Sequence, residues 1–244
     1  MENALTTEKL YDLYIEDLQK TEEYKDGTIH QRVKNIDAWK RLVASCTNPD
    51  GPVDLGAEIT KGRNVWFWSD HHFGHNNVLK YCNRPFPSTE LMRDCLIGNH
   101  NKLVGVDDIT VFVGDVSFLD SHVKVNDILN QMNGYKILVL GNHDIERDRY
   151  VPYAFDEICV VKAFQHQHNG VYINFTLTHY PFTNVPEDMY YTTINVHGHI
   201  HDKQSKEEHQ INVSVEAVNY KPMNFNDILI KAKGRLTSMA GVFA

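Results

Sequence analysis

The segment V-W-F-W-S-D-H-H-F-G-H at 65–75 decides the fold, because four apolar residues end abruptly in acidic and imidazole side chains. The run from Val65 to Trp68 has the length and the bulky residues of a strand that is buried on both faces. Two similar apolar runs follow at 109–113 and 137–140, and each also ends in glycine and a polar residue. We therefore expect three core strands, with the functional side chains directly after the end of each strand.

Helical patterns separate these runs, at 88–96 and at 125–132, and strands that alternate with helices predict βαβ units with parallel strands. The later runs at 171–177, 194–196 and 211–215 alternate apolar with polar residues, which is typical of strands that face the core on one side. We therefore expect an α/β fold, a layered sandwich of two packed mixed β-sheets flanked by helices, in which the second sheet is one-sided.

The first sixty residues differ from the rest in pattern. Two amphipathic helices are expected at 10–18 and 29–43, followed by a turn-rich connection at 47–62. The sequence thus predicts an N-terminal helical extension at 1–61 and a main domain at 62–244.

Two interpretations of this extension stay open. The helices could simply pack on the core, which is the usual fate of an amphipathic pair. Alternatively they could cap the substrate or join subunits, with the aromatic residues Trp39, Tyr11 and Tyr14 stacking on a base. The sequence does not indicate an oligomeric state.

Composition narrows the class of partner. The 244 residues carry a formal net charge of −8, which disfavours long nucleic acids because binding a polyanion needs clustered Lys and Arg. A small phosphorylated substrate fits better. There is no apolar run long enough to span a membrane and no secretory signal, and the four cysteines show no paired short spacing. We expect a soluble cytoplasmic protein with reduced thiols and no membrane partner.

Metal ligation is the chemistry that the polar strand ends suggest. Asp70 and His72 are two residues apart just beyond a strand, so both can face one ion. Asp115 follows a glycine at the end of the next strand, and its two carboxylate oxygens can bridge two ions. A bridging carboxylate requires a second set of ligands.

That second set is available further along the chain in Asn142, His179 and His199, while His201 can return to the first ion. Nitrogen and oxygen ligands without thiolate suit two divalent ions such as manganese, iron, zinc, nickel or cobalt, and manganese is the first choice for assays.

Five motifs in order now carry a resemblance to a known family: S-D-H-H-F-G-H at 69–75, G-D at 114–115, G-N-H-D at 141–144, T-H-Y-P at 178–181 and G-H-I-H at 198–201. They resemble the calcineurin-like metallophosphoesterases, and the segments 73–86 and 212–222 look like small bacterial and phage members. The resemblance implies a fold of two packed sheets flanked by helices. It also implies one ion held by Asp70, His72, Asp115 and His201, a second held by Asp115, Asn142, His179 and His199, and a catalytic role for His143.

The expected reaction is hydrolysis of a phosphate ester. His143, oriented by Asp144, would stabilise the transition state or protonate the leaving oxygen. His75 and Arg84 are candidates for phosphate contact, although Arg84 could equally be a structural ion-pair partner.

The substrate follows less directly from the sequence than the reaction does. A phosphomonoesterase of small nucleotides is expected first, as a 5′-nucleotidase that could act on deoxynucleoside monophosphates. A phosphodiesterase or nuclease acting on cyclic nucleotides or nucleic acid is the alternative, and a non-catalytic metal-binding regulatory module is disfavoured.

The remaining histidines have ordinary interpretations. A pair two residues apart precedes Asn169-Gly170, so it belongs to an exposed hairpin rather than to a metal site. The hairpin pair is His166 and His168; His197 is expected to be structural or to support a ligand, and His30, His100, His122 and His209 to be surface or core residues.

Overall fold

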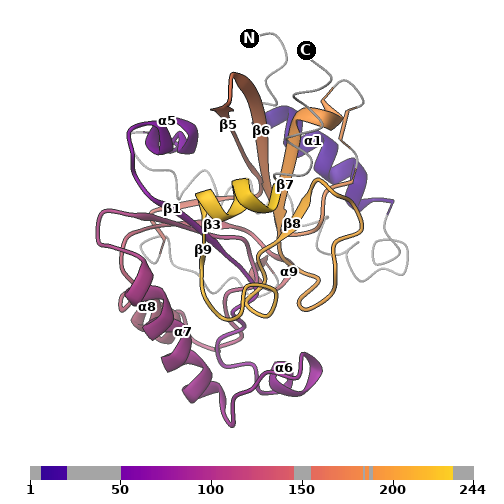
Figure 1. Cartoon of the computed structure of the whole chain (residues 1–244). Helices are drawn as coiled ribbons and strands as arrows, with labels where there is room; N and C mark the ends of the chain where they lie inside the picture. Colours follow the sequence, from indigo (N-terminus) through magenta and orange to yellow (C-terminus); the bar gives the residue numbers. More distant parts are fainter. Residues whose placement is uncertain (1–6, 21–50, 146–154, 184, 187–188, 233–244) are drawn as a thin grey trace.

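The computed structural model describes residues 7–20, 51–145, 155–183, 185–186 and 189–232. Its first sheet has five strands in the order β4-β3-β2-β1-β9, of which Figure 1 labels β1, β3 and β9. Neighbours from β1 to β4 are parallel, and β9 pairs with β1 in the antiparallel direction. The strands are β1 (Val65–Trp68), β2 (Ile109–Phe112), β3 (Tyr135–Val139), β4 (Glu157–Cys159) and β9 (Met223–Asn224).

The second sheet has four strands in the order β5-β6-β7-β8. β5 and β6 form an antiparallel hairpin, and the other neighbours are parallel. The predicted sandwich of two mixed sheets is therefore confirmed. The strands are β5 (Lys162–His168), β6 (Val171–Thr178), β7 (Thr193–His197) and β8 (Gln210–Asn212).

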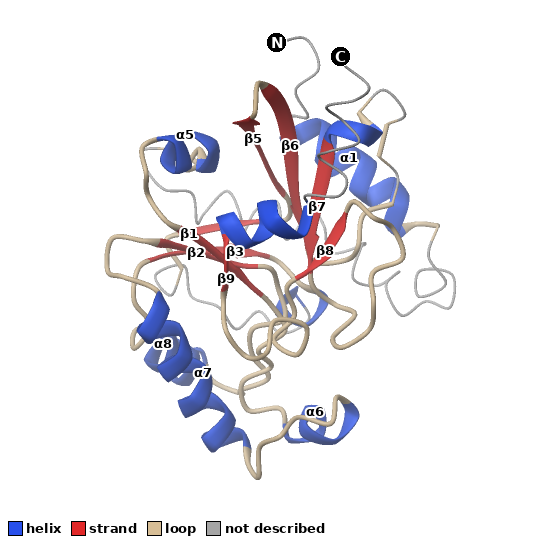
Figure 2. Cartoon of the chain, in the orientation of Figure 1, coloured by secondary structure: helices blue, strands red, loops and turns tan. Residues whose placement is uncertain are grey.

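Helices cover the outer faces of both sheets (Figure 2). The longest, α7, begins after Ser88, whose hydroxyl accepts a hydrogen bond from the Leu91 amide, as the sequence predicted for a capped helix. A further helix starts at 225 and is described as far as 232. The others are α1 (Thr7–Leu18), α5 (Leu55–Thr60), α6 (Asn76–Tyr81), α7 (Thr89–Leu103), α8 (His122–Leu129), α9 (Asn142–Ile145) and the 3-10 helix η2 (Tyr190–Thr192).

Three apolar cores fill the spaces between these layers. In β1, Val65 and Phe67 point into the core between the sheets, whereas Trp68 points into the core beneath α7 and α8. β2 and β3 repeat this alternation. Because apolar side chains leave both faces, the three strands read as continuous apolar runs in the sequence.

The second sheet is not one-sided, contrary to the alternation of its sequence. All five residues of β7 and the last six of β6 are buried. The polar face is satisfied internally, because the Asn195 amide donates to the hydroxyls of Thr176 and Thr178 and its oxygen accepts from the Phe182 amide. Paired polar groups can be buried at little cost. The alternation of polar residues along β6 and β7 therefore does not indicate a solvent-exposed face.

The N-terminal helix α1 forms a third core with the segment that follows β6. Leu10 and Tyr14 are buried there against Tyr180 and Phe182, and the Asp17 carboxylate accepts hydrogen bonds from Thr183. α1 therefore packs on the main domain, as the first of the two interpretations has it, and the alternative in which Tyr14 stacks on a base does not fit its burial.

The connection expected at 47–62 contains a helix, α5, instead of turns alone. Asp54 caps it by accepting from the Ala57 amide, and Leu55 is fully buried in the core between the sheets. The second predicted helix at 29–43, Trp39 and His30 lie outside the described residues. No helix in the described ranges is long and apolar enough to cross a membrane.

Candidate metal centre

Five separate segments bring the predicted ligands together where the two sheets meet. Asp70 and His72 follow β1, Asp115 follows β2, and Asn142 opens α9 after β3. The second sheet contributes His179 directly after β6 and the segment 198–201 after β7. The Ser69 amide, which donates to the Val213 carbonyl, joins the two sheets at this point. Carboxyl ends of parallel strands meet at one edge, which is why residues so far apart in sequence converge.

The first group consists of Asp70, His72 and His201, whose ligand atoms lie within 4.8 Å of one another. The Asp70 Oδ1 atom lies 3.8 Å from His72 Nε2 and 3.9 Å from His201 Nε2. These distances are too long for hydrogen bonds. They suit atoms that share an ion, because two ligands that are each about 2.0–2.2 Å from a metal lie roughly 3–4 Å apart.

Asp115 connects this group to a second one. Its Oδ2 atom lies 3.8 Å from His72 Nε2 on one side and 3.3 Å from His179 Nε2 on the other. His179 Nε2 is also 3.1 Å from the Asn142 side-chain oxygen. The position of Asp115 between the two groups agrees with the bridging role predicted for it.

His199 lies beside His179, but its ring nitrogens do not belong to the groups of ligand atoms that lie within 4.8 Å of one another. The ring centroids of His199 and His179 are 5.3 Å apart, and Tyr180 packs on His199 at 4.0 Å. The Tyr180 amide in turn donates to the Tyr14 hydroxyl of α1. The first helix therefore supports the wall behind His199.

Buried polar atoms of the first group fit a cation. Asp70 Oδ2 accepts hydrogen bonds from the hydroxyls of Ser69 and Ser214 and from the His199 amide. By contrast, Asp70 Oδ1 and both ring nitrogens of His72 are buried with no hydrogen-bond partner. Leaving such groups unpaired costs about 1–3 kcal/mol each, and ligation would satisfy them. The residues present can hold a metal ion.

Glycines allow the loops to approach this closely. A Cβ atom at Gly141 would come closer than 3 Å to the Asp115 side chain, and one at Gly198 would do the same to Ser69 and Asp70. Any larger residue would push the carboxylates out of position. The glycines of the G-N-H-D and G-H-I-H motifs are therefore needed because there is no room for a side chain, and not because of backbone flexibility.

The ligand backbones themselves are strained. Five of the nine non-glycine residues with positive φ in the described ranges are predicted ligands. A left-handed conformation at such residues costs about 1 kcal/mol or more each and persists only where the surroundings impose it. This concentration of strain at one place indicates a functional site. The residues are Asp70 (58°), His72 (51°), Asp115 (55°), His199 (71°) and His201 (53°).

His143 lies at the open side of the centre, with about a quarter of its side chain exposed (27%). Its Nε2 atom is 3.9 Å from Asp115 Oδ2, and its backbone amide donates to Asp115 Oδ1. It can therefore face a substrate that lies beside Asp115.

Asp144 was expected to orient His143, and the structure shows further partners for its carboxylate. It is buried, and its carboxylate accepts hydrogen bonds from the amides of Asp115, Val116 and Gly141. These bonds fasten the loop after β2 to the loop after β3. These contacts give Asp144 the role of positioning Asp115.

Arg84 is a structural ion-pair partner, and the predicted contact between Arg84 and phosphate is wrong. Its side chain has no exposed surface; it pairs with Glu216 at 2.7 Å and donates to the carbonyls of Asp70 and His71. The guanidinium is fully occupied by these partners, which hold the loop of Asp70 and His71 in place, and it cannot reach a substrate. The other candidate, His75, is half-buried and stacks on Phe118 at 3.9 Å.

Sequence reasoning missed Glu216. Its Oε1 atom accepts a hydrogen bond from His201 Nδ1 at 3.0 Å, which leaves His201 Nε2 facing Asp70. A carboxylate behind a ligating imidazole fixes its orientation. The sequence did contain a signal for it, because Glu216 is an acidic residue directly after a run that contains the buried Val213 and Val215. Cys82 is also near, but Glu216 is already bonded to Arg84 and His201, so we interpret this cluster as support for His201.

The other histidines are placed largely as predicted. The pair on β5 belongs to a hairpin, whose turn residues Asn169 and Gly170 both have positive φ. His100 is buried against Thr110, and His209 is buried with its Nε2 donating to the Phe182 carbonyl. His197 bonds Ser205 and its neighbour's carbonyl; it has no direct contact with the ligands among the interactions described. His122 begins α8 and is exposed.

Metal affinity is expected to rise with pH. Burial disfavours the charged form of His179, but the Asp115 carboxylate overcomes this and raises the pKa of His179 to about 9 in the metal-free protein. An ion must displace that proton, so below pH 9 we expect affinity to fall about tenfold per pH unit for this proton. Calorimetric titration with Mn²⁺ between pH 6 and 9, in buffers of different ionisation enthalpy, measures both affinity and proton release. An affinity that does not change over this range would contradict the expectation.

Replacing Glu216 by glutamine should weaken metal binding by about 10- to 100-fold, because His201 loses the charged acceptor that orients it. Excess metal should restore the occupancy of the site without changing its affinity. Equilibrium dialysis measures the affinity, and circular dichroism must show that the variant is folded, since Arg84 loses its buried partner. Glu208→Gln makes the same chemical change at an exposed position. Equal effects in the two variants would rule out a role for Glu216 behind His201.

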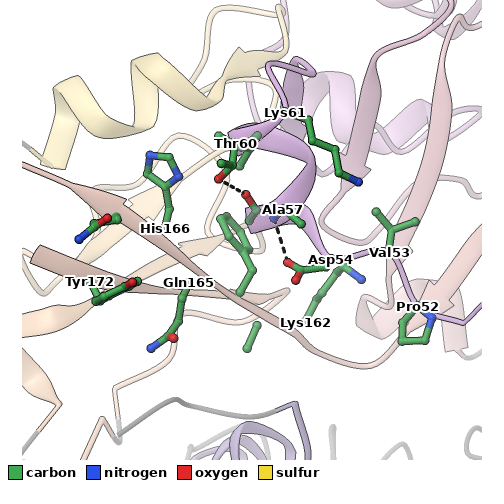
Figure 3. Close-up of a pocket in the computed structure, with 15 residues that line it drawn as sticks. Pro52, Val53, Asp54, Ala57, Thr60, Lys61, Lys162, Gln165, His166 and Tyr172 are labelled. Carbon is green, nitrogen blue, oxygen red and sulfur yellow. Dashed lines mark hydrogen bonds between the residues drawn. The ribbon is translucent and has the colours of Figure 1, made fainter. Parts of the chain in front are cut away.

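A cavity of about 1090 Å³ lies elsewhere, between α5 and β5 (Figure 3). None of the predicted ligands lines it. Its two lysines are already paired, Lys61 with Glu58 and Lys162 with Glu157. Because both lysines are paired in this way and Asp54 adds a negative charge, the cavity is a weaker candidate for phosphate chemistry than the ligand cluster.

Comparison with known proteins gives relatives without an assigned activity. No protein-family model matches the chain. The Gene 66 protein of Mycobacterium phage L5 is 25% identical over 181 residues, which cover 63% of this chain and 87% of the phage protein. A crystal structure of a protein of unknown function from Aquifex aeolicus superposes with a TM-score of 0.51 at 25% identity, covering 68% of this chain and 97% of the other.

An archaeal relative is more similar in sequence. The uncharacterized protein MJ1445 of Methanocaldococcus jannaschii is 35% identical over 184 residues, which cover 69% of this chain and 90% of that protein. Identity at this level over nearly the whole relative indicates common descent and a shared fold. The chain described here belongs to the same protein family as MJ1445.

Proposed function

We propose that the protein is a phosphoester hydrolase that depends on two divalent metal ions, of the calcineurin-like metallophosphoesterase type. One observation carries this proposal: Asp115 Oδ2 lies within 3.8 Å of imidazole nitrogens from two different groups, His72 and His179. A single carboxylate between two sets of nitrogen and oxygen donors is what a dinuclear site requires.

The chain's own residues then divide the work. When bound, the two ions would supply the positive charge that acidifies a water molecule and neutralises phosphate oxygens. Asp70, His72 and His201 would hold one ion; Asp115 would hold both. Asn142, His179 and His199 would hold the second. His143, partly exposed beside Asp115, would donate a proton to the leaving oxygen.

Manganese is the first metal to test, with iron, zinc, nickel and cobalt as alternatives, because the donor set contains imidazole, carboxylate and amide oxygen. The substrate that we favour is a small nucleotide with a terminal phosphate. The formal charge of −8 supports a small substrate over a long nucleic acid.

A panel of phosphate esters tests the proposal. We expect release of inorganic phosphate from deoxynucleoside 5′-monophosphates with added Mn²⁺, and loss of the activity with EDTA. Bis-(p-nitrophenyl) phosphate, cyclic nucleotides and single-stranded DNA should react at least about ten times more slowly. Dominant cleavage of the diesters would indicate a phosphodiesterase or nuclease. Absence of turnover with every metal would indicate a binding or regulatory module.

A further inference from the structure

Tyr81 is the most exposed large hydrophobic residue in the described ranges, with 77% of its surface accessible. It is the last residue of α6, the helix that follows the loop of the predicted ligands Asp70 and His72. A single exposed aromatic residue is common on protein surfaces. The position of Tyr81 relative to the metal ligands is what makes it informative.

A series of ring contacts connects Tyr81 to the centre. Its ring and that of His75 lie in a T-shaped arrangement, with the centroids 6.4 Å apart. His75 stacks on Phe118 at 3.9 Å with an angle of 10° between the planes. Phe118 in turn contacts His143 at 4.5 Å and His72 at 5.1 Å. His75 also contacts His72 directly, with the ring centroids 5.5 Å apart. One imidazole therefore separates the exposed phenol from a predicted metal ligand.

This ring series has a definite order of exposure. His72 is buried, Phe118 and His75 are half-buried, and Tyr81 is exposed. The inner rings pack on each other and hold their planes, so only the outer ring offers an unused face. A substrate whose phosphate lies at Asp115 and His143 would extend over these rings toward the surface.

We propose that Tyr81, supported by His75 and Phe118, forms a stacking subsite for the base of a nucleotide substrate. The inference rests on the proposed phosphoester hydrolysis and adds the part of the substrate that the metal centre does not contact. Stacking accepts any base, because every base has a π-face. The subsite would therefore select nucleotides over ring-free esters without choosing one base.

The test is a ratio of specificities. The variant Tyr81→Ala should lower kcat/KM for dAMP relative to that for glycerol phosphate by about 5- to 150-fold, the range measured when a stacking aromatic is truncated. The loss should lie mainly in KM. Tyr81→Phe keeps the ring and should restore the ratio. Tyr172→Ala, at a 60% exposed tyrosine on β6, is the matched control.

An unchanged ratio in Tyr81→Ala would overturn the subsite while leaving the hydrolase proposal intact. A failure of the wild-type protein to hydrolyse any ester would instead reject the hydrolase proposal. In that case, equilibrium dialysis of dAMP with Mn²⁺ still tests stacking. Binding weakened in Tyr81→Ala and restored in Tyr81→Phe would support the subsite, and equal or absent binding would reject it.

Discussion

Replacing Asp115 by asparagine is expected to lower phosphate release by on the order of 10³- to 10⁴-fold, which corresponds to losing several kcal/mol of charge stabilisation. Asp115 Oδ2 lies between His72 and His179 and faces His143 at 3.9 Å. A neutral amide has only one oxygen and no charge to hold two cations together. We therefore expect the variant to lose at least one ion.

The substitution is well matched to the backbone. Asp115 has φ 55°, a conformation that asparagine adopts more readily than most residues, and an amide oxygen can still accept the bond from the His143 amide. Circular dichroism should thus show an intact fold. Metal content and initial rates are the measurements, with Asp127→Asn at an exposed position of α8 as control. A variant that keeps two ions and more than about a tenth of the activity would exclude the bridging role.

Removal of the His143 side chain should have the second-largest effect: a fall in turnover of about 10²- to 10⁴-fold, the usual contribution of a general acid. His143→Ala should still bind metal, because the backbone amide that holds Asp115 Oδ1 is kept. Metal loss in this variant would mean that His143 is a ligand instead.

Two esters that differ in leaving group sharpen the test. An alkyl phosphate leaves as a basic alkoxide and needs a proton, whereas p-nitrophenyl phosphate leaves as a stable anion. The loss in His143→Ala should therefore be larger for the alkyl ester. Equal losses would show that His143 stabilises the phosphoryl group rather than the leaving oxygen. His122→Ala at the exposed start of α8 controls for removal of an imidazole.

The sequence could predict the core and the ligand positions because both depend on local pattern. Val65 and Phe67 alternate with Trp68 between two apolar cores, so the strand had to appear as an uninterrupted run. Parallel strands align their carboxyl ends, so polar residues such as Asp70 and Asp115 at those ends had to be neighbours. These inferences require no knowledge of side-chain partners.

What could not be predicted depends on partners distant in the chain. Arg84 could equally bind a substrate or a carboxylate until Glu216, 132 residues later, was found beside it. The polar residues of β6 and β7 suggested exposure, but Asn195 and Thr176 satisfy each other inside the fold. Tyrosine is a residue type that often contacts ligands, yet α1 packs on the main domain and buries Tyr14.

The left-handed conformation of the ligand loops has a consequence for thermostability. Asparagine or glycine at His72 or His201 would relax the backbone, and yet each change would remove an imidazole from the centre. Heat resistance and the proposed hydrolysis therefore make opposite demands at these positions. Selection for thermal stability alone is expected to replace His72 and His201 early. Selection that also requires turnover should keep both histidines and their left-handed backbone.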